Sequence, residues 1–373
     1  MANMNDYLDW RGDLTFYQDP FCEVDNLILA QLAYTDFDGI VPDLASGEKI
    51  SLRDVFNQYY KLHTAEEILH RVSFVKLAPF LMDKLVQTAR FQNIRLMAYE
   101  NHINQEKGSQ FSAITYELGD GSLCIAYRGT DDTFTGWKED FKFSYQDETI
   151  GQGVAVDYLN AIASGAGKKR LRVCGHSKGG NFAVYAAAMA EPEFQQCLDA
   201  VYTNDGPGFR GKLLRNAGYH RVLPLIHSFI PEDSVIGLLL ENMFTHTVVK
   251  CKGIGIMQHD AMNWEVLGHR FVRVAAPSET SRFFQETFRR WIDGMSDRQR
   301  EEFVHSLFSI VEATGARTIG EIKKEGLISV GEMLRKMWEM PKEKQADFLG
   351  AWGRLIASAK DTLEREREGE SEE

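Results

Sequence analysis

The stretch from residue 170 to residue 190 constrains the fold more than any other part of this sequence. It begins with a short run in which Leu171, Val173 and Cys174 are apolar, which is typical of a buried strand. The pentapeptide GHSKG follows at residues 175–179, and an alanine-rich segment with high helix propensity comes next. A strand, a Gly-x-Ser-x-Gly turn and a helix in this order are the context of a nucleophile elbow.

The chemistry of such a turn explains why glycines stand two residues to either side of Ser177. A serine on so sharp a turn has a strained backbone, and side chains at Gly175 and Gly179 would collide with the neighbouring strand and helix. We therefore predict that the turn lifts the Ser177 hydroxyl clear of the sheet, above the positive end of the next helix. The alternative is a glycine-rich turn whose serine only caps that helix.

Composition excludes several classes of protein. Of the 373 residues, 44% are hydrophobic and 26% are charged, as in ordinary globular proteins. The net charge of −12 argues against a protein that binds nucleic acid or an anionic membrane surface, since both need clustered positive charge. We predict no nucleic-acid partner.

The sequence also bears on the cellular compartment. The opening residues, MANMNDYLDWRGD, lack the basic start and apolar core of a signal peptide. The longest apolar runs are too short to span a bilayer, so we expect no stable membrane insertion. Five cysteines without metal-type spacing indicate neither a zinc site nor a disulfide framework. We predict a cytoplasmic, reduced protein without a metal.

The order of expected elements indicates the fold class. Residues 111–118 and 122–127 read as two strands joined by a Gly-Asp-Gly turn, which is a strong hairpin signal. Expected strands and helices then alternate up to about residue 275. We predict an α/β-hydrolase sheet that is mostly parallel and covered on both faces, with an antiparallel hairpin at one edge. Apolar residues at helical spacing predict a helical cover over about residues 36–100.

The chain changes character after Pro277. Aromatic and aliphatic residues recur there at helical spacing, so we expect residues 1–276 to form the hydrolase domain and 277–363 a helical appendage. Core packing is the favoured explanation of its aromatic stripes, and peripheral contact with lipid is the alternative. The final residues, 364–373, are charged and without apolar side chains, which predicts a disordered tail.

A nucleophilic serine needs a histidine to take its proton and a carboxylate to orient that histidine. In α/β-hydrolases the acid and the histidine follow the serine in the chain, and each lies where a strand ends. Asp205 and Asp233 both end expected strands after the elbow. Asp205 lies in Asn-Asp-Gly-Pro-Gly, where a turn role is common, so we favour Asp233 and keep Asp205 as the alternative.

Four histidines follow Asp233 in the sequence. His259 lies in a glycine-containing loop after an expected strand, as a catalytic base requires. The others lie inside a strand, at the start of a strand and in the appendage: His246, His269 and His305. We therefore predict His259 as the base, with an ordinary loop histidine as the alternative.

The oxyanion of a tetrahedral intermediate needs two backbone donors. One should be the N–H of Lys178, directly after the nucleophile. The other should come from an earlier strand end, and Arg128-Gly129-Thr130 is the natural source. Gly129 permits a close backbone approach, while Thr130 offers both an N–H and a hydroxyl.

These motifs resemble a known group. The segment Tyr127 to Thr130 with Trp137 and Asp140, then GHSKGG, then PEDSV and a late histidine, is similar to the class 3 (fungal-type) lipases. The resemblance implies an oxyanion donor at Thr130 and a triad of Ser177, Asp233 and His259. The opening YLDWRGDLTF and the QHDAMNW segment resemble more closely a bacterial branch named after a mesenteric, oestrogen-dependent adipogenesis protein. Lys178 departs from the leucine or alanine common in lipases, and it would place a cation beside the site.

We therefore expect a serine hydrolase that cleaves carboxylic esters through an acyl-enzyme, with small esters or acyl lipids as candidate substrates. Such a triad needs no cofactor. Two alternatives remain open. The chain could be a non-catalytic binding or scaffold protein of this fold, or it could use the same triad as an acyltransferase or thioesterase. The sequence indicates no oligomeric state.

Overall fold

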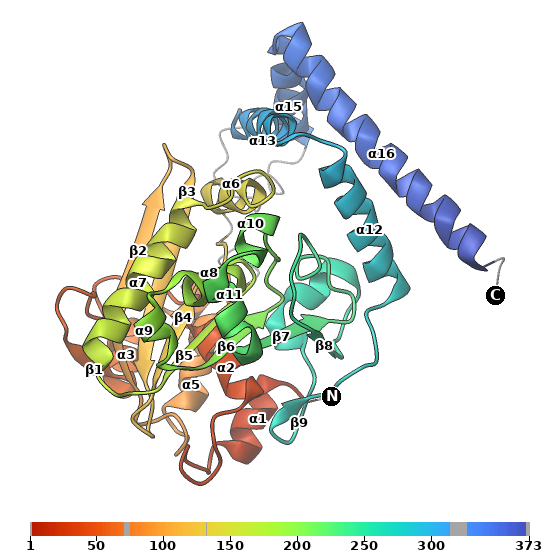
Figure 1. Ribbon diagram of the computed structural model, residues 1–373. Coiled ribbons are helices and arrows are strands. Elements are labelled where there is room, and N and C mark those ends of the chain that lie inside the picture. Colours follow the sequence, from red (N-terminus) through yellow and green to blue (C-terminus); the bar gives the residue numbers. More distant parts are fainter. Residues whose placement is uncertain (1, 71–74, 132, 314–326, 371–373) are drawn as a thin grey trace.

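The computed structural model describes residues 2–70, 75–131, 133–313 and 327–370. Its centre is an eight-stranded sheet in which the strands lie in the order of the sequence (Figure 1). The pairs from β1 to β4 are antiparallel, and those from β4 to β8 are parallel. The strands are β1 (Lys49–Ser51), β2 (Arg95–Asn104), β3 (Ser109–Glu117), β4 (Leu123–Tyr127), β5 (Leu171–His176), β6 (Leu198–Asn204), β7 (Ile226–Pro231) and β8 (His246–Val249).

The antiparallel edge contains the predicted hairpin. Strands β3 and β4 pair in antiparallel register, with Tyr116 opposite Cys124, and Gly121 takes a φ of 78° in the turn between them. Strand β2 was not predicted, because its first residues fall within the expected helical cover. A mainly parallel sheet with an antiparallel edge confirms the predicted α/β-hydrolase fold class.

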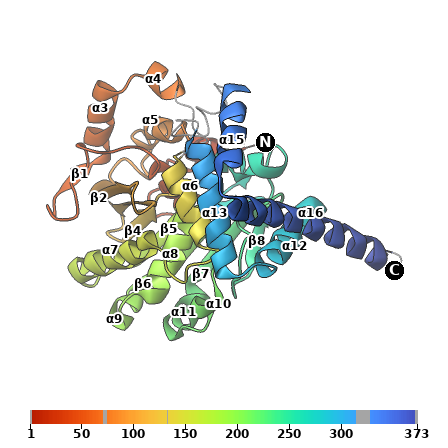
Figure 2. The ribbon, with the colours of Figure 1, turned by 90° about the horizontal axis from the view of Figure 1, so that it is seen from above.

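Helices cover both faces of the sheet (Figure 2). The alternation along β4 divides the core, since Cys124 and Ala126 face one hydrophobic cluster while Leu123 and Ile125 face another. The first cluster is covered by α1 (Met4–Arg11), α2 (Glu23–Leu32), α3 (Leu52–Leu62) and α5 (Leu81–Leu85), with α4 (Ala65–His70) nearby. The second is covered by α7 (Ile150–Ala166), α8 (Lys178–Met189) and α11 (Ala217–Val222), and the short α9 (Pro192–Gln195) and α10 (Gly211–Leu214) flank them.

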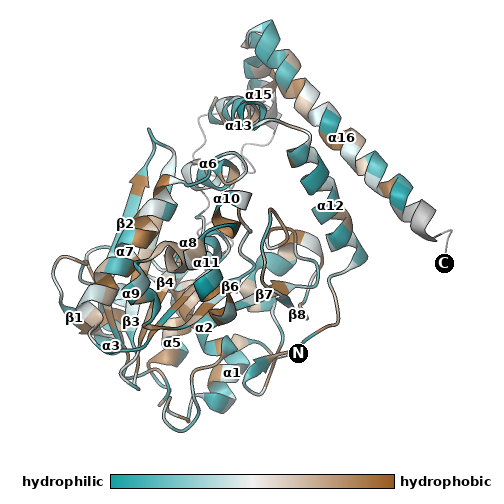
Figure 3. Ribbon diagram, viewed as in Figure 1, coloured by the Kyte–Doolittle hydropathy of each residue, from teal (hydrophilic) through white to brown (hydrophobic). Residues whose placement is uncertain are grey.

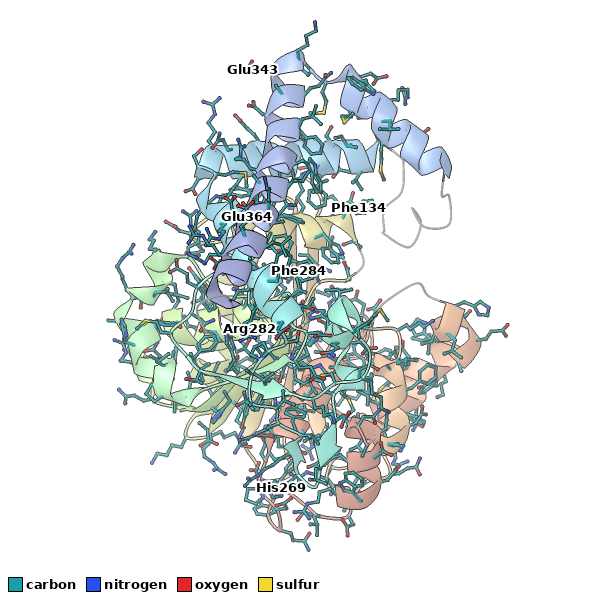
Figure 4. All side chains as sticks on the ribbon, turned by 90° about the vertical axis from the view of Figure 1, so that its right-hand side faces the viewer. Phe134, His269, Arg282, Phe284, Glu343 and Glu364 are labelled. Atoms are coloured by element: carbon teal, nitrogen blue, oxygen red, sulfur yellow. The ribbon has the colours of Figure 1, made fainter. Side chains whose placement is uncertain are left out.

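The C-terminal helices form a third hydrophobic cluster above the sheet. They are α12 (Glu279–Asp293), α13 (Asp297–Glu312), α15 (Leu327–Glu339) and α16 (Lys342–Glu370). Trp291, Phe303 and Phe348 are buried in it, which confirms core packing for these members of the aromatic stripes. The cluster also takes in Phe134 of α6 (Phe134–Lys142) and Tyr145, and Figure 4 shows Phe134 beneath the C-terminal helices.

The expected disordered tail is corrected by the structure. Helix α16 continues through residues 364–370, whereas residues 371–373 lie outside the described part of the chain. Glutamate and arginine have high helix propensity, and charges four residues apart support a helix, as Lys360 and Glu364 do at 3.7 Å. In Figure 3 the helix shows long hydrophilic stretches broken by hydrophobic patches.

No helix in the described residues combines the length and the apolar character needed to cross a bilayer.

Candidate active site

Ser177 occupies the predicted elbow between β5 and α8. Its backbone has φ 57° and ψ −132°, a conformation that residues other than glycine rarely adopt. A Cβ at Gly175 would lie 2.1 Å from the carbonyl of Gly179, and one at Gly179 would lie 2.0 Å from the oxygen of Tyr127. Ser177 stands at the N-cap of α8, but its side chain makes no capping hydrogen bond. The helix-cap alternative is therefore not supported.

The acidic side chain that is hydrogen-bonded to the ring of His259 is Asp205. Its Oδ2 lies 2.6 Å from Nδ1 of His259, and its Oδ1 accepts hydrogen bonds from Ser234 and Gly237. Burial alone would raise the pKa of Asp205, but the hydrogen bonds from His259 and Ser234 outweigh it and lower the pKa below its ordinary value. The carboxylate is therefore ionised and can only accept, so Nδ1 of His259 is the donor; when the ring is neutral, Nε2 has the free lone pair.

The prediction that Asp233 orients His259 is wrong. Its Oδ2 instead accepts hydrogen bonds from the backbone of Gly255 at 2.9 Å and from the amide of Gln258 at 3.3 Å. These partners belong to the 3₁₀ turn at Gly255–His259. Asp233 thus secures the loop that carries the histidine, whereas Asp205 holds its ring.

His176, directly before the nucleophile, holds the backbone of the same loop. Its Nε2 lies 2.8 Å from the carbonyl oxygen of His259, which can only accept, so Nε2 carries a proton. The hydroxyl of Tyr34 lies 3.0 Å from Nδ1. Burial, helped by the nearby His259, lowers the pKa of His176 to about 3, and the ring is therefore neutral at pH 7.

Thr130 and Lys178 flank Ser177 at the same edge of the sheet. Among the described residues, the backbone N–H groups of both lack a hydrogen-bond acceptor, as donors to an oxyanion would. The Thr130 hydroxyl is already engaged, since it donates to Oδ2 of Asp140 at 2.5 Å. Only its N–H is available to a ligand.

Lys178 lines the cavity, as expected of a cation beside the site, but its ammonium is not free. The Lys178 side chain is buried, and its Nζ lies 2.9 Å from Oε1 of Gln110 and 3.3 Å from Oε2 of Glu139. Glu139 is also fully buried. The ammonium is therefore neutralised within the protein, because an unpaired charge in such surroundings would be costly.

A cavity of about 340 Å³ connects these groups with the C-terminal helices. Ser177, His259, Thr130 and Lys178 all line it. The rest of the lining is largely apolar and includes Leu239 and Leu240 after β7, Ile256 and Met257 in the histidine loop, Trp137 and Phe141 of α6, and Phe288, Trp291, Ile292, Met295, Phe303 and Val304 of α12, α13 and their junction. The helical appendage thus forms one wall of the candidate site.

Sequence reasoning missed the groups that support the site from a distance. Tyr34 lies 142 residues before His176, and Glu139 lies 39 residues before Lys178. No local motif links such pairs. The sequence did contain a signal for Asp205 as the acid. Asp205 directly follows β6, and β6 is the strand that pairs with the nucleophile strand β5.

Two solved structures are similar to part of the chain. The Rhizomucor miehei lipase propeptide complex shares 13% identity with a TM-score of 0.33, over 45% of this chain and 70% of that one. M37 lipase shares 14% identity with a TM-score of 0.34, over 48% and 70%. A search of the curated proteins finds no match.

The family model described as Mbeg1-like matches residues 85–309, which is more than half of the 373 residues. The resemblance to the lipase-like branch of that name is thereby confirmed, and the chain belongs to the Mbeg1-like family.

Proposed function

We propose that this protein is a serine hydrolase that cleaves carboxylic esters with an apolar acyl group. Membership of a lipase-like family supports an ester hydrolase in general terms. The observation that carries the finer proposal is the 2.6 Å hydrogen bond between His259 and the buried Asp205, in a cavity that also contains the strained Ser177.

The arrangement suits nucleophilic catalysis. Nε2 of His259 takes the proton of the Ser177 hydroxyl as the oxygen attacks the ester carbonyl, and the ionised Asp205 stabilises the imidazolium that forms. The N–H groups of Thr130 and Lys178 donate to the oxyanion. His259 then returns the proton to the leaving alcohol, and an acyl group remains on Ser177. Water, activated by the same histidine, releases the acid and regenerates the serine.

The cavity supports an apolar acyl group as the recognised part of the substrate. Its wall from α12 and α13 is built mainly from aromatic and aliphatic side chains, including Phe288, Trp291 and Phe303. Arg300 also lines this wall and pairs with Asp297 at 3.1 Å. The one lysine in the lining is paired with Glu139. Apolar surface removed from water is worth roughly 25 cal/mol per Å², so such a wall favours hydrocarbon chains. Acyl lipids are the candidate substrates.

The test is labelling of the protein with a fluorophosphonate probe, followed by hydrolysis of p-nitrophenyl esters of graded chain length. We expect the wild-type protein to be labelled and Ser177→Ala not to be labelled, at a similar melting temperature. Labelling that persists without the hydroxyl removes the proposal. A folded wild-type protein that is neither labelled nor active would instead favour a non-catalytic binding protein.

A further inference from the structure

Lys178 is an unusual residue to find buried directly after a nucleophile. Its side chain is 1% exposed and extends away from Ser177 toward α6. There Nζ meets Gln110 and the fully buried Glu139, whose two oxygens also accept the backbone N–H groups of Gln110 and Gly151. The lysine whose N–H faces the oxyanion site therefore ties the elbow to α6.

Asp140, the next residue on α6, lies between Lys178 and Thr130. Its Oδ2 accepts the Thr130 hydroxyl, while its Oδ1 lies 4.0 Å from Nζ of Lys178. That Oδ1 atom is buried and lacks a hydrogen-bond partner among the described residues. The lysine is thus the nearest positive charge to a carboxylate that holds the second oxyanion donor.

The surroundings of Asp140 have opposing effects on its pKa. Burial raises the pKa of Asp140 to about 6, with smaller contributions in the same direction from Glu139 and Asp131. Lys178 and the Thr130 hydroxyl act in the opposite direction. Without the ammonium the balance moves toward the protonated acid, which would no longer require the threonine hydroxyl as a donor.

We propose that Lys178 is a positioning residue for the oxyanion site, an inference that rests on the proposed function. Its charge keeps Asp140 ionised, so that Asp140 accepts the Thr130 hydroxyl and holds the Thr130 N–H toward the cavity. The single side chain of Lys178 thereby couples the two donors, since its own N–H is the other one. The competing explanation is that Lys178 only compensates the buried charge of Glu139.

The double variant K178M/E139Q separates these explanations, because it removes both charges and leaves neither one buried alone. The matched control is E139Q, which keeps the ammonium beside Asp140. With short p-nitrophenyl esters we expect K178M/E139Q to lose at least about tenfold in kcat with little change in KM, as for weakened oxyanion stabilisation. The pH below which its kcat falls, the acid limb of the pH–rate profile, should move to a higher value. E139Q should keep the wild-type kcat, and its acid limb should move, if at all, to lower pH, because the charge of Glu139 raises the pKa of Asp140. Wild-type kcat and pH profile in the double variant would overturn the proposal.

Thr130→Val gives a second measurement that leaves the lysine intact. In a T130V background, the change K178M/E139Q should cause little further loss of kcat, because the hydroxyl through which Lys178 acts is absent. The acid limb of T130V should also differ from that of the wild type. An equal loss in both backgrounds, or identical acid limbs, would overturn the proposal. Fluorophosphonate labelling of Ser177 is measured in parallel, since a wild-type protein without labelling refutes the proposed function itself.

Discussion

Oδ2 of Asp205 lies 2.6 Å from Nδ1 of His259, and the carboxylate is 1% exposed. Asp233 ends the neighbouring strand but contacts the loop of His259 through Gly255 and Gln258. The structure therefore gives these two acids different contacts, one with the ring of His259 and one with the loop that carries it.

We expect Asp205→Asn to reduce kcat by about 10⁴, because the amide favours the wrong histidine tautomer. Asp233→Asn should retain most activity, since an asparagine oxygen can still accept the N–H of Gly255. Steady-state kinetics on one ester, with melting temperatures of both variants, provide the comparison. The reverse ranking would return the role of the acid to Asp233.

The strained backbone of Ser177 predicts an effect on stability. A non-glycine residue at φ 57° costs about 1–3 kcal/mol, whereas glycine adopts such angles freely. Ser177→Gly should therefore raise the free energy of unfolding by roughly 1 kcal/mol, after the greater entropy of the unfolded glycine chain is subtracted. Ser177→Ala keeps the strain and should unfold like the wild type. Urea unfolding measures both, and equal stabilities for the two variants would contradict this explanation.

The wall of the cavity offers a matched pair of phenylalanines on α12. Phe288 lines the cavity. Phe284, which Figure 4 labels, lies one turn earlier on α12, is 37% exposed and is absent from the lining. If the wall binds the acyl chain, Phe288→Ala should raise KM for p-nitrophenyl decanoate by about tenfold, through about 1.5 kcal/mol of lost apolar contact. The effect on the acetate ester should be smaller. Phe284→Ala should resemble the wild type, and equal effects of the two substitutions would exclude this wall from substrate binding.

The sequence was sufficient to predict the features that depend on residues close together in the chain. The elbow at Ser177 and the hairpin before it follow from glycine placement and strand periodicity, and both appear in the structure as predicted. His259 was identified from its loop, and the structure brings it to a buried acid. Residues 364–370 were misjudged because charge alone was used, although the same residues have high helix propensity.

The choice between Asp205 and Asp233 could not be made in the same way. Both acids end strands, and which one meets His259 depends on how the loop after β8 returns across the sheet. The turn chemistry that argued against Asp205 is present, since its φ is 49°. Asp205 therefore forms the sharp turn and also holds the ring of His259. Long-range contacts such as Lys178 with Glu139 depend likewise on the packed fold.

The last prediction concerns His176, whose pKa burial lowers to about 3 from an ordinary value of 6.5. Below about pH 6.5 the unfolded chain takes up a proton that the folded protein refuses until about pH 3. His176 alone therefore lowers the free energy of unfolding as the pH falls from 6.5 toward 3, by about 1.4 kcal/mol per pH unit. At pH 5 the loss amounts to about 2 kcal/mol.

His176→Gln removes the titration while keeping an N–H that can reach the carbonyl oxygen of His259. The variant should be less stable than the wild type at pH 8, because a packed ring and its contact with Tyr34 are lost. Between pH 8 and pH 5 it should then lose about 2 kcal/mol less than the wild type, since Asp205 and the other acids titrate in both proteins. Urea unfolding at the two pH values measures the difference. Parallel losses would mean that His176 becomes charged in the folded protein within this pH range, and that burial does not keep its ring neutral.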